Sequence, residues 1–595
     1  MCRIAGILHT ATPVATIQKT VATMCDLLKH GGPDDEGIYT AAEEHLVLGN
    51  RRLALMDLTA AGHQPMQYGN RYTITYNGEL YNFKELKELL IADGMQFQTQ
   101  SDTEVILAAF AKWNTQSFSK FNGMFAFALW DNEEKKLYLV RDAAGIKPLY
   151  YSTHTDGICF ASEIRGFSPI PYMQEKEKHA AVYQLAYGFI PEPITVLAHV
   201  KALPKGCFCM YDFHTNSTSI QSFKFFSFSS TVFEEGIAKS LIYNSLQDAV
   251  QRQMLADKEV GIFLSGGIDS AIIAKLANQQ TEKKLHTLSI YFEEENYSEK
   301  KYQDIIAGEV NSIHHSILLK EDEFHKDFGE VISSMDMPTC DGINTWFISK
   351  FAAEEGLKAV LSGIGADELY GGYPSFKRIN KALLLQNLPH RLLQLSDRLD
   401  SKKYNRLAYL KLEGIRGIYL FLRGHFTPVQ IAAQLGSYEN DIWNILSARP
   451  ASPKLKRLGA QSKASWLEYN IYMQDQLLRD ADVMSMAHGL EIRVPFLDDK
   501  VIETAFSIDE KTKFKYTIPK QLLINSFENI LPEAIWNRPK MGFSFPFNEW
   551  LKHSPFVKDL GVSENKETIK AVDEFMKGEL HWSRIMSLLV LKHKL

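Results

Sequence analysis

Apolar and polar positions alternate in the first part of the chain, and this pattern predicts strands and turns with a few helices. Residues 71–76 alternate as a strand, and residues 123–130 and 136–140 predict a further strand pair. Asn77 and Gly78 follow the first of these strands and form a dipeptide that is typical of a tight hairpin turn. This half of the chain is therefore expected to be α+β.

One helix is predicted between these strands, because apolar residues repeat at helical spacing from Phe83 to Leu90. Asn82 stands at the N-cap position, Glu85 at the capping-box position and Gly94 just past the end. We therefore expect Asn82 to cap this helix rather than to bind a ligand.

Apolar strands and helices alternate later in the chain. Strands are predicted at residues 260–264, 286–292 and 358–361, and a helix is predicted from Ala271, after a glycine turn. This order favours a parallel α/β sheet, and such sheets bind ligands at their carboxyl edge. From residue 377 onward, long amphipathic helices are expected.

The chain has 595 residues, which exceeds the length that a single hydrophobic core usually supports, so we expect two domains. A polar stretch rich in Ser and Phe at residues 214–230 interrupts the pattern of strands. The expected division is a first domain at 1–210, a linker at 211–232 and a second domain at 233–595.

The composition is that of an ordinary soluble protein: 45% hydrophobic residues, 23% charged residues and a formal net charge of −6. It gives no sign of nucleic-acid binding. No apolar run has membrane-spanning length, and the start lacks a secretory pattern, so we expect a cytoplasmic protein without membrane association. Of the six cysteines only Cys207 and Cys209 are close together, which predicts reduced thiols rather than disulfides or zinc ligands.

Cys2 is the first candidate for chemistry. Removal of Met1 would leave Cys2 with both a thiol and a free α-amine, so one residue would supply a nucleophile and a neighbouring base. The amine titrates near pH ~8 and the thiol near ~8.5, so proton exchange between them needs little tuning.

A glycine turn after the strand at 260–264 is the second candidate. In the run Ser265, Gly266, Gly267, Ile268, Asp269, Ser270, the glycines let the main chain approach a polyphosphate. The run lacks the lysine ending of a Walker A loop. An ordinary strand-to-helix turn, with Asp269 as an acidic residue at the helix start, is the alternative.

A second glycine turn at residues 362–368 follows the next identifiable strand and carries Asp367. Two such loops at one sheet edge would enclose a nucleotide. Asp269 and Asp367 would then be the two carboxylates that hold Mg²⁺.

The first glycine turn (SGGIDS) is similar to the ATP pyrophosphatase loop of the glutamine-hydrolysing asparagine synthetase family. The resemblance covers nearly the whole chain. Its further motifs, in matching order, are residues 49–66 (GNRRLALMDLTAAGHQPM), 76–82 (YNGELYN), 101–107 (SDTEVIL), 141–151, 490–498 (LEIRVPFLD) and 538–543 (RPKMGF).

This resemblance implies two domains: an Ntn-hydrolase αββα sandwich of class II amidotransferase type, and an ATP pyrophosphatase (HUP-like) domain with a parallel α/β sheet and many helices. Cys2 would attack the glutamine side-chain amide and release ammonia, with the Asn77 side chain and the Gly78 N–H as oxyanion hole. Glutamine would be bound by Arg52, Asn77, Glu79 and Asp102. From the residues alone, Asp102 also fits a helix cap and Arg52 a surface ion pair.

In the second domain the resemblance implies that an acceptor carboxylate is activated by ATP as an acyl-adenylate, which ammonia then attacks. Mg²⁺ would be held by Asp269 and Asp367, and Lys520 would stabilise the transition state; from the residues alone, this lysine also fits a solvated position. The implied nucleotide-binding residues are Phe263, Ser265, Gly266, Gly267, Asp269, Ser270, Ile290, Ser362 and Gly363.

Two departures from the family pattern stand out. The family usually reads Met-Cys-Gly at the start and His-Arg-Gly-Pro-Asp later, whereas this chain has Arg3 and Gly31 at these places. We hypothesise that Arg3 supplies the missing guanidinium to the glutamine site. Ile364 replaces a glutamate of the best-known members, which bears on the identity of the acceptor.

The leading hypothesis is a glutamine-dependent asparagine synthetase acting on aspartate and ATP. One alternative is an amide synthetase of the same family that acts on another carboxylate, such as a sugar acid or a natural-product intermediate. Another is a glutamine- or nucleotide-binding homologue without turnover. A homodimer is expected from the resemblance.

Overall fold

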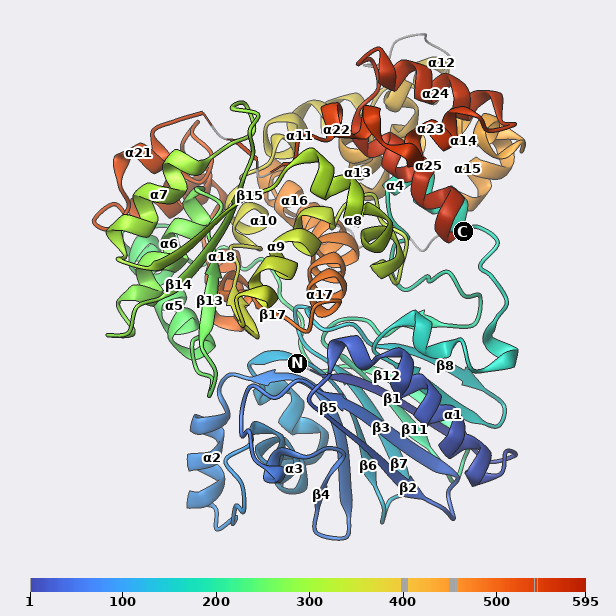
Figure 1. Cartoon of the computed structure of the whole chain (residues 1–595), viewed down its shortest axis with the longest axis vertical. Coiled ribbons are helices and arrows are strands. Elements are labelled where there is room, and N and C mark those ends of the chain that lie inside the picture. The colour runs from blue at the N-terminus through green and yellow to red at the C-terminus, as the bar shows by residue number, and fades with distance from the viewer. Residues whose placement is uncertain (1, 397–404, 449–454, 456, 540, 543) are drawn as a thin grey trace.

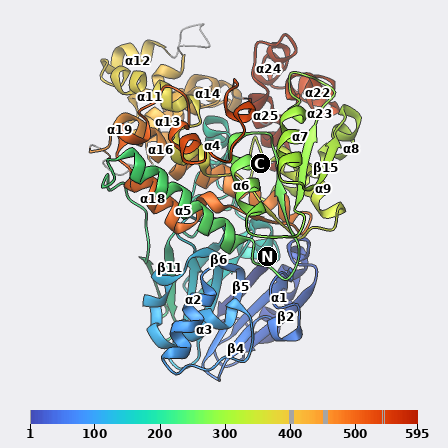
Figure 2. The same cartoon turned by 90° about the vertical axis from the view of Figure 1, so that its left-hand side faces the viewer.

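The computed structural model describes residues 2–396, 405–448, 455, 457–539, 541–542 and 544–595 (Figure 1). Two six-stranded sheets form the N-terminal region, and a five-stranded sheet lies in the C-terminal region. The two regions are stacked along the long axis of the molecule, with the N-terminal region below in both views (Figure 2). Within the described ranges, no helix combines the length and the apolar character that a membrane crossing requires.

The N-terminal region is an αββα sandwich, as predicted. Helix α1 (Val14–Leu27) covers the first sheet, and α2 (Phe83–Ala92) and α3 (Asp102–Trp113) cover the second. All strand pairs are antiparallel. The first sheet has the order β10 (Lys201–Ala202), β8 (Tyr150–His154), β9 (Gly157–Ala161), β1 (Arg3–His9), β3 (Leu46–Arg52), β2 (Asp35–Ala41). The second has β12 (Ser217–Ser222), β11 (Cys207–Asp212), β7 (Lys136–Arg141), β6 (Gly123–Asp131), β5 (Tyr72–Leu80), β4 (Met66–Tyr68).

The alternation along β1 explains why the strand is buried on both faces. Ile4 and Leu8 belong to the core between the two sheets, whereas Ala5 and Ile7 pack toward α1. Successive side chains of a strand point to opposite faces, so one strand serves two cores.

The hairpin turn predicted at Asn77 and Gly78 is wrong. Both residues lie inside β5, opposite Ala126 and Phe125 of β6. A Cβ atom on Gly78 would lie 2.1 Å from the main-chain oxygen of Met124. The glycine therefore allows a close approach of two strands and does not mark a turn.

The cap predicted for α2 is also wrong, although the helix begins at Phe83 directly after Asn82. The Asn82 side chain makes no cap bond: its Nδ2 donates to the Lys120 oxygen at 2.9 Å, and its Oδ1 accepts from the Asn122 nitrogen at 3.0 Å. It joins the start of α2 to the segment before β6, so a tertiary contact replaces the local one.

The C-terminal sheet is parallel, as predicted. Its order is β15 (Ile313–Leu318), β14 (His286–Tyr291), β13 (Val260–Phe263), β16 (Ala359–Leu361), β17 (Glu491–Arg493). The chain order of the strands reverses between β13 and β16, so the loops that leave these two strands run to opposite sides and leave a crevice between them. This switch point is where both glycine turns lie. The strands β15 and β17 were not predicted from the sequence.

Many helices follow α3 in the chain, and several of them contact the strands of the parallel sheet. They are α4 (Ala180–Tyr187), α5 (Glu235–Gln253), α6 (Ile268–Asn278), α7 (Lys300–Glu309), α8 (Glu321–Ser334), α9 (Ile343–Glu354), α10 (Ala366–Tyr370), α11 (Pro374–Leu385), α12 (His390–Ser396), α13 (Ile415–Arg423), α14 (Pro428–Leu435), α15 (Glu439–Ser447), α16 (Ala460–Leu467), α17 (Leu478–Met486), α18 (Asp499–Ser507), α19 (Glu510–Lys513), α20 (Gln521–Ser526), α21 (Glu533–Trp536), α22 (Phe547–His553), α23 (Pro555–Gly561), α24 (Lys566–Met576) and α25 (Trp582–Lys594).

The chain after residue 377 is helical, as expected, but most of its helices are short. The exception is one continuous run in which a π-helical segment, Glu468–Leu477, joins α16 to α17. Strand β12 lies within residues 211–232, the expected linker, and pairs with β11, so the second sheet of the N-terminal region continues to Ser222.

Candidate active sites

Cys2 and Asn77 are in contact at the start of the chain. The Cys2 main-chain nitrogen donates to Asn77 Oδ1 at 3.2 Å. Asn77 is fully buried in β5, and its Nδ2 has no hydrogen-bond partner among the residues that the structure describes. Burial raises the pKa of the Cys2 thiol, while a hydrogen bond from the Leu53 main chain and the charge of Arg52 act in the opposite direction. Thiol, amide and guanidinium thus share one buried site.

The expected glutamine ligands surround this site. The Arg52 guanidinium donates to the main-chain oxygens of Met56 at 3.0 Å and Asp57 at 2.6 Å, so it shapes the loop after β3. Burial, followed by the charge of Glu491, raises the pKa of Glu79 well above its usual value. Glu79 and Arg52 both contribute to the electrostatics at Cys2.

Asp102 is buried at the first turn of α3. Its Oδ2 accepts from the Tyr76 hydroxyl at 3.0 Å and from the Leu80 nitrogen at 2.9 Å. Burial raises its pKa, and these two bonds lower it. Asp102 therefore holds the strand that carries Asn77 and Glu79.

Arg3 lies elsewhere. Its side chain is fully buried and forms ion pairs with Glu163 Oε1 at 2.6 Å and with Asp482 Oδ2 at 2.9 Å. The structure thus does not bring the Arg3 guanidinium to the thiol of Cys2, because neighbouring side chains of an extended chain point in opposite directions. The hypothesis that Arg3 binds glutamine therefore has no support from the geometry.

The second site is a cavity of about 860 Å³ at the switch point of the parallel sheet. Of the residues expected to bind the nucleotide, all but Gly266 line it, namely Phe263, Ser265, Gly267, Asp269, Ser270, Ile290, Ser362 and Gly363. Gly266 instead accepts a hydrogen bond from Arg538 at 2.8 Å through its main-chain oxygen. The glycine turn precedes α6, whose N-terminus is suited to phosphate.

Lys520 joins the two glycine turns. Its Nζ lies 2.8 and 2.7 Å from the two carboxylate oxygens of Asp269 and 2.5 Å from Asp367 Oδ1. Burial alone would lower the pKa of Lys520, but the charges of Asp269 and Asp367 raise it above its usual value. The lysine is therefore a fixed cation in the cavity, not a solvated side chain.

Asp269 and Asp367 fit a Mg²⁺ ion. Both carboxylates face one point, marked by the Lys520 ammonium, and Mg²⁺ prefers such oxygen donors beside the phosphates of a nucleotide. A Cβ atom on Gly372 would lie 1.6 Å from Asp367 Oδ1, so the glycine makes room for this carboxylate.

Two buried acids that the sequence did not single out, Glu368 and Asp480, also line the cavity. Burial, with Asp367 as neighbour, raises the pKa of Glu368 to about 7, and burial raises the pKa of Asp480 to about 7. Glu368 accepts from the Tyr373 hydroxyl at 2.7 Å, and Asp480 from Thr339 Oγ1 at 2.8 Å. These acids, like Ile364, line the cavity next to the expected nucleotide site.

Two further arginines were also missed as site residues, although both lie in motifs of the resemblance. Arg493 of β17 pairs with Glu491 at 2.5 Å and reaches Glu79 at 3.5 Å. Arg538 pairs with Glu299 at 2.6 Å and so braces the first glycine turn. Sequence reasoning could not place them because Glu79 and Glu299 are distant from them in the chain.

Two protein-family models match successive parts of the chain. The glutamine amidotransferase domain model matches residues 1–224, and the asparagine synthase model matches residues 241–587. Asparagine synthetase [glutamine-hydrolyzing] 1 of Bacillus subtilis is 33% identical over 578 residues, which cover 93% of this chain and 88% of that protein.

More distant relatives include one named as an asparagine synthetase and one named as an amidase. Asparagine synthetase [glutamine-hydrolyzing] 3 of Bacillus subtilis is 29% identical over 604 residues, covering 96% of this chain and 90% of that protein. Amidase chry2 of Gibberella zeae is 24% identical over 675 residues, covering 96% of this chain and 93% of that protein. The chain therefore belongs to the asparagine synthase family, with a glutamine amidotransferase domain ahead of the synthase domain.

Proposed function

We propose that the protein is a glutamine-dependent, AMP-forming asparagine synthetase. The observation that carries the glutaminase half is the orientation of Asn77: Oδ1 accepts from the Cys2 nitrogen, and Nδ2 is a buried donor without a partner among the described residues. A buried orphan donor beside a nucleophile is suited to an oxyanion. Cys2 would attack the glutamine amide carbon and expel ammonia, and water would then release glutamate from the thioester.

In the synthase half, a carboxylate oxygen of aspartate attacks the α-phosphorus of ATP, and pyrophosphate leaves. Ammonia then attacks the acyl carbon, and AMP leaves with formation of the amide. Lys520 stabilises the negative charge that develops at phosphorus. A Mg²⁺ ion held by Asp269 and Asp367 would neutralise phosphate charge when bound.

We propose that the boundary between the glutaminase unit and the synthase unit lies in the segment of chain after β12 and before α5. Strand β12 completes the second N-terminal sheet at Ser222, and α5 begins at Glu235. This assigns Cys2 and Lys520 to separate units.

The test is pyrophosphate release with ATP, Mg²⁺ and glutamine, in the presence and absence of aspartate, with mass spectrometry of the product. Aspartate-dependent pyrophosphate together with asparagine supports the proposal. Glutamate release from glutamine, without any pyrophosphate release when either glutamine or ammonium is the nitrogen source, contradicts the choice of aspartate.

A second candidate keeps the reaction but replaces aspartate with another carboxylate. The observation in its favour is Ile364, an apolar side chain that lines the cavity beside Gly363. Pyrophosphate release in a panel of sugar acids and amino acids, with aspartate inactive, would favour this candidate.

A further inference from the structure

The continuous helical run from α16 to α17 contacts both the synthase cavity and the N-terminal region. Leu477 and Asp480 line the synthase cavity. Arg479 donates to the main-chain oxygen of Ile190 at 3.0 Å, and Asp482 pairs with Arg3, so these residues face the N-terminal region. Asp480 and Asp482 are two residues apart on one helix: Asp480 lines the cavity, and Asp482 pairs with the residue directly after Cys2.

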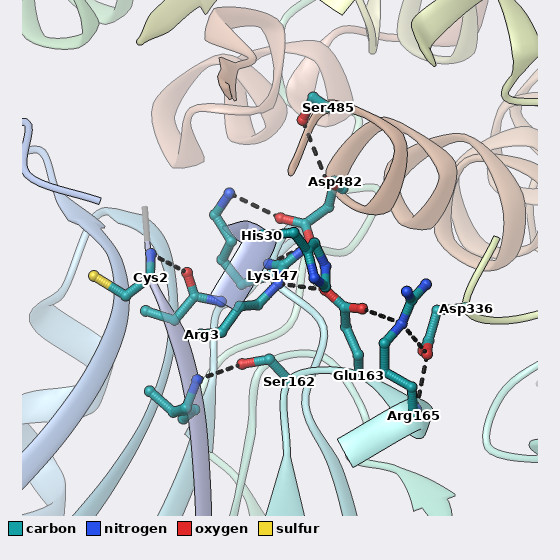
Figure 3. Close-up of polar contacts among 12 residues, drawn as sticks. Cys2, Arg3, His30, Lys147, Ser162, Glu163, Arg165, Asp336, Asp482 and Ser485 are labelled. Atoms are coloured by element: carbon teal, nitrogen blue, oxygen red, sulfur yellow. Dashed lines mark hydrogen bonds and ion pairs between the residues drawn. The ribbon is translucent and has the colours of Figure 1, made fainter. Parts of the chain in front are cut away.

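Asp482 belongs to a buried set of charged residues at the junction of the two regions (Figure 3). Arg3 Nε lies 2.6 Å from Glu163 Oε1, and Arg3 NH1 lies 2.9 Å from Asp482 Oδ2. Lys147 Nζ lies 3.2 Å from Asp482 Oδ1, and His30 Nε2 lies 2.9 Å from Glu163 Oε1. Arg3, Lys147, Glu163 and Asp482 have 0%, 1%, 0% and 3% of their side chains exposed.

Charges buried to this degree hold their positions tightly, because separating them leaves an uncompensated charge. Burial alone would raise the pKa of Glu163, but the charges of Arg3 and His30 lower it below its usual value. The carboxylate therefore stays ionised, and the Arg3 pairs persist at neutral pH.

Arg3 is directly bonded to Cys2 and takes the space of residue 31. A Cβ atom on Gly31 would lie 2.7 Å from Arg3 Cγ and 2.9 Å from its Nε. Two of the positions at which this chain departs from the family pattern are thus in contact. The Arg3 side chain fits in this position because residue 31 is a glycine.

We propose that Arg3 is a positioning residue that couples the nucleophile to the synthase cavity through α17. Its ion pairs with Glu163 and Asp482 fix the strand that carries Cys2 against the helix that carries Asp480. Occupation of the cavity then favours the hydrolysis-competent position of Cys2, so that glutamine is consumed when an acceptor is present. The inference rests on the proposed function, since it requires that glutamine hydrolysis serves the synthase site.

The test compares Arg3→Met and Asp482→Asn with the parent protein. Three rates are measured: glutamate release with glutamine alone, glutamate release with ATP, Mg²⁺ and acceptor, and pyrophosphate release driven by ammonium. The parent should release glutamate faster with ATP and acceptor. In both variants this stimulation should be smaller by about fivefold or more. Ammonium-driven pyrophosphate release should stay within about twofold of the parent rate. A double variant should lose no more stimulation than either single variant.

Lys358→Met is the matched control. Lys358 also forms an ion pair across the junction, with Asp34 at 2.7 Å. However, it lies directly before β16, outside α17, and its side chain is 31% exposed. It should keep the stimulation. The exchange variant Arg3→Gly with Gly31→Arg should recover at least about a third of it, because the space vacated by Arg3 accepts the new side chain.

Retained stimulation in Arg3→Met and Asp482→Asn would overturn the inference, and so would absence of stimulation in the parent. An equal loss of all three rates would also overturn it, because that result describes a purely structural role. Failure of the proposed function is recognised separately: the parent then releases no pyrophosphate with ammonium and any acceptor.

Discussion

Lys520 holds both carboxylate oxygens of Asp269, at 2.8 and 2.7 Å from its Nζ. The two residues come from loops 251 positions apart. Both residues line the cavity at the switch point of the parallel sheet, and Lys520 places a positive charge where ATP would present its phosphates.

Replacement of Lys520 by alanine should abolish pyrophosphate release while glutamate release continues at Cys2. We expect a loss of about 100- to 1000-fold in kcat, typical for removal of a preorganised charge from a transition state. The loss should be the same with ammonium as nitrogen source. The control is Lys515→Ala, a lysine that is 59% exposed and paired with Glu235; it should change kcat by less than about twofold, since exposed ion pairs contribute little.

Replacement of Cys2 by alanine should remove glutamine-driven synthesis and leave ammonium-driven synthesis intact. Asn77→Ala should lower glutaminase kcat by about 100- to 1000-fold, because an oxyanion donor is lost. Cys25→Ala serves as control for a buried thiol outside the site, since burial raises the pKa of Cys25 to about 12. Equal losses in Cys2→Ala and Cys25→Ala would contradict the assignment of the nucleophile.

The sequence predicted the two sheet types because alternation and apolar runs are local signals. The strands β6, β7, β13, β14 and β16 appear in the structure within two residues of their predicted bounds. The pattern could not predict β15, β17 or the continuation of β5 through Gly78, because short strands depend on partners far away in the chain. The Asn77-Gly78 dipeptide favours a turn locally, but its pairing with β6 overrides that preference.

The residues at the two sites were largely predictable through motifs, whereas their contacts were not. The glycine turns and Lys520 are separated by more than 150 positions, and only the fold brings them to one cavity. The contacts of Arg3 could not be predicted for the same reason: its partner Asp482 lies on α17 and gives no signal near residue 3.

Glu368 should make stability depend on pH. Burial raises its pKa to about 7, so the folded state retains a proton that the unfolded chain loses near pH ~4.3. Stability from this group is therefore fully present below pH ~4 and is lost as pH rises toward about 7. Glu368→Gln should raise the free energy of unfolding relative to the parent by an amount that grows to about 3 kcal/mol between pH 4.5 and 7.

The measurement is chemical denaturation of both proteins across this pH range. Glu503→Gln is the control for removal of one carboxylate, because Glu503 is 47% exposed. A difference between Glu368→Gln and the parent that is constant with pH would show that the Glu368 carboxyl ionises normally.

Gly78→Ala tests the close approach of β5 and β6 at the nucleophile. The added Cβ would lie 2.1 Å from the Met124 oxygen and 2.6 Å from the Phe125 Cα, both main-chain atoms that cannot turn aside. We expect a loss of about 1–3 kcal/mol in the free energy of unfolding, together with reduced glutaminase activity, because Asn77 moves with the strand. Gly236→Ala is the matched control: this glycine lies in the first turn of α5, with no atom within 4 Å of a new Cβ, and the change should stabilise the protein by about 0.5–1 kcal/mol. Equal effects of the two substitutions would mean that β6 does not hold β5 in register at the Cys2 site.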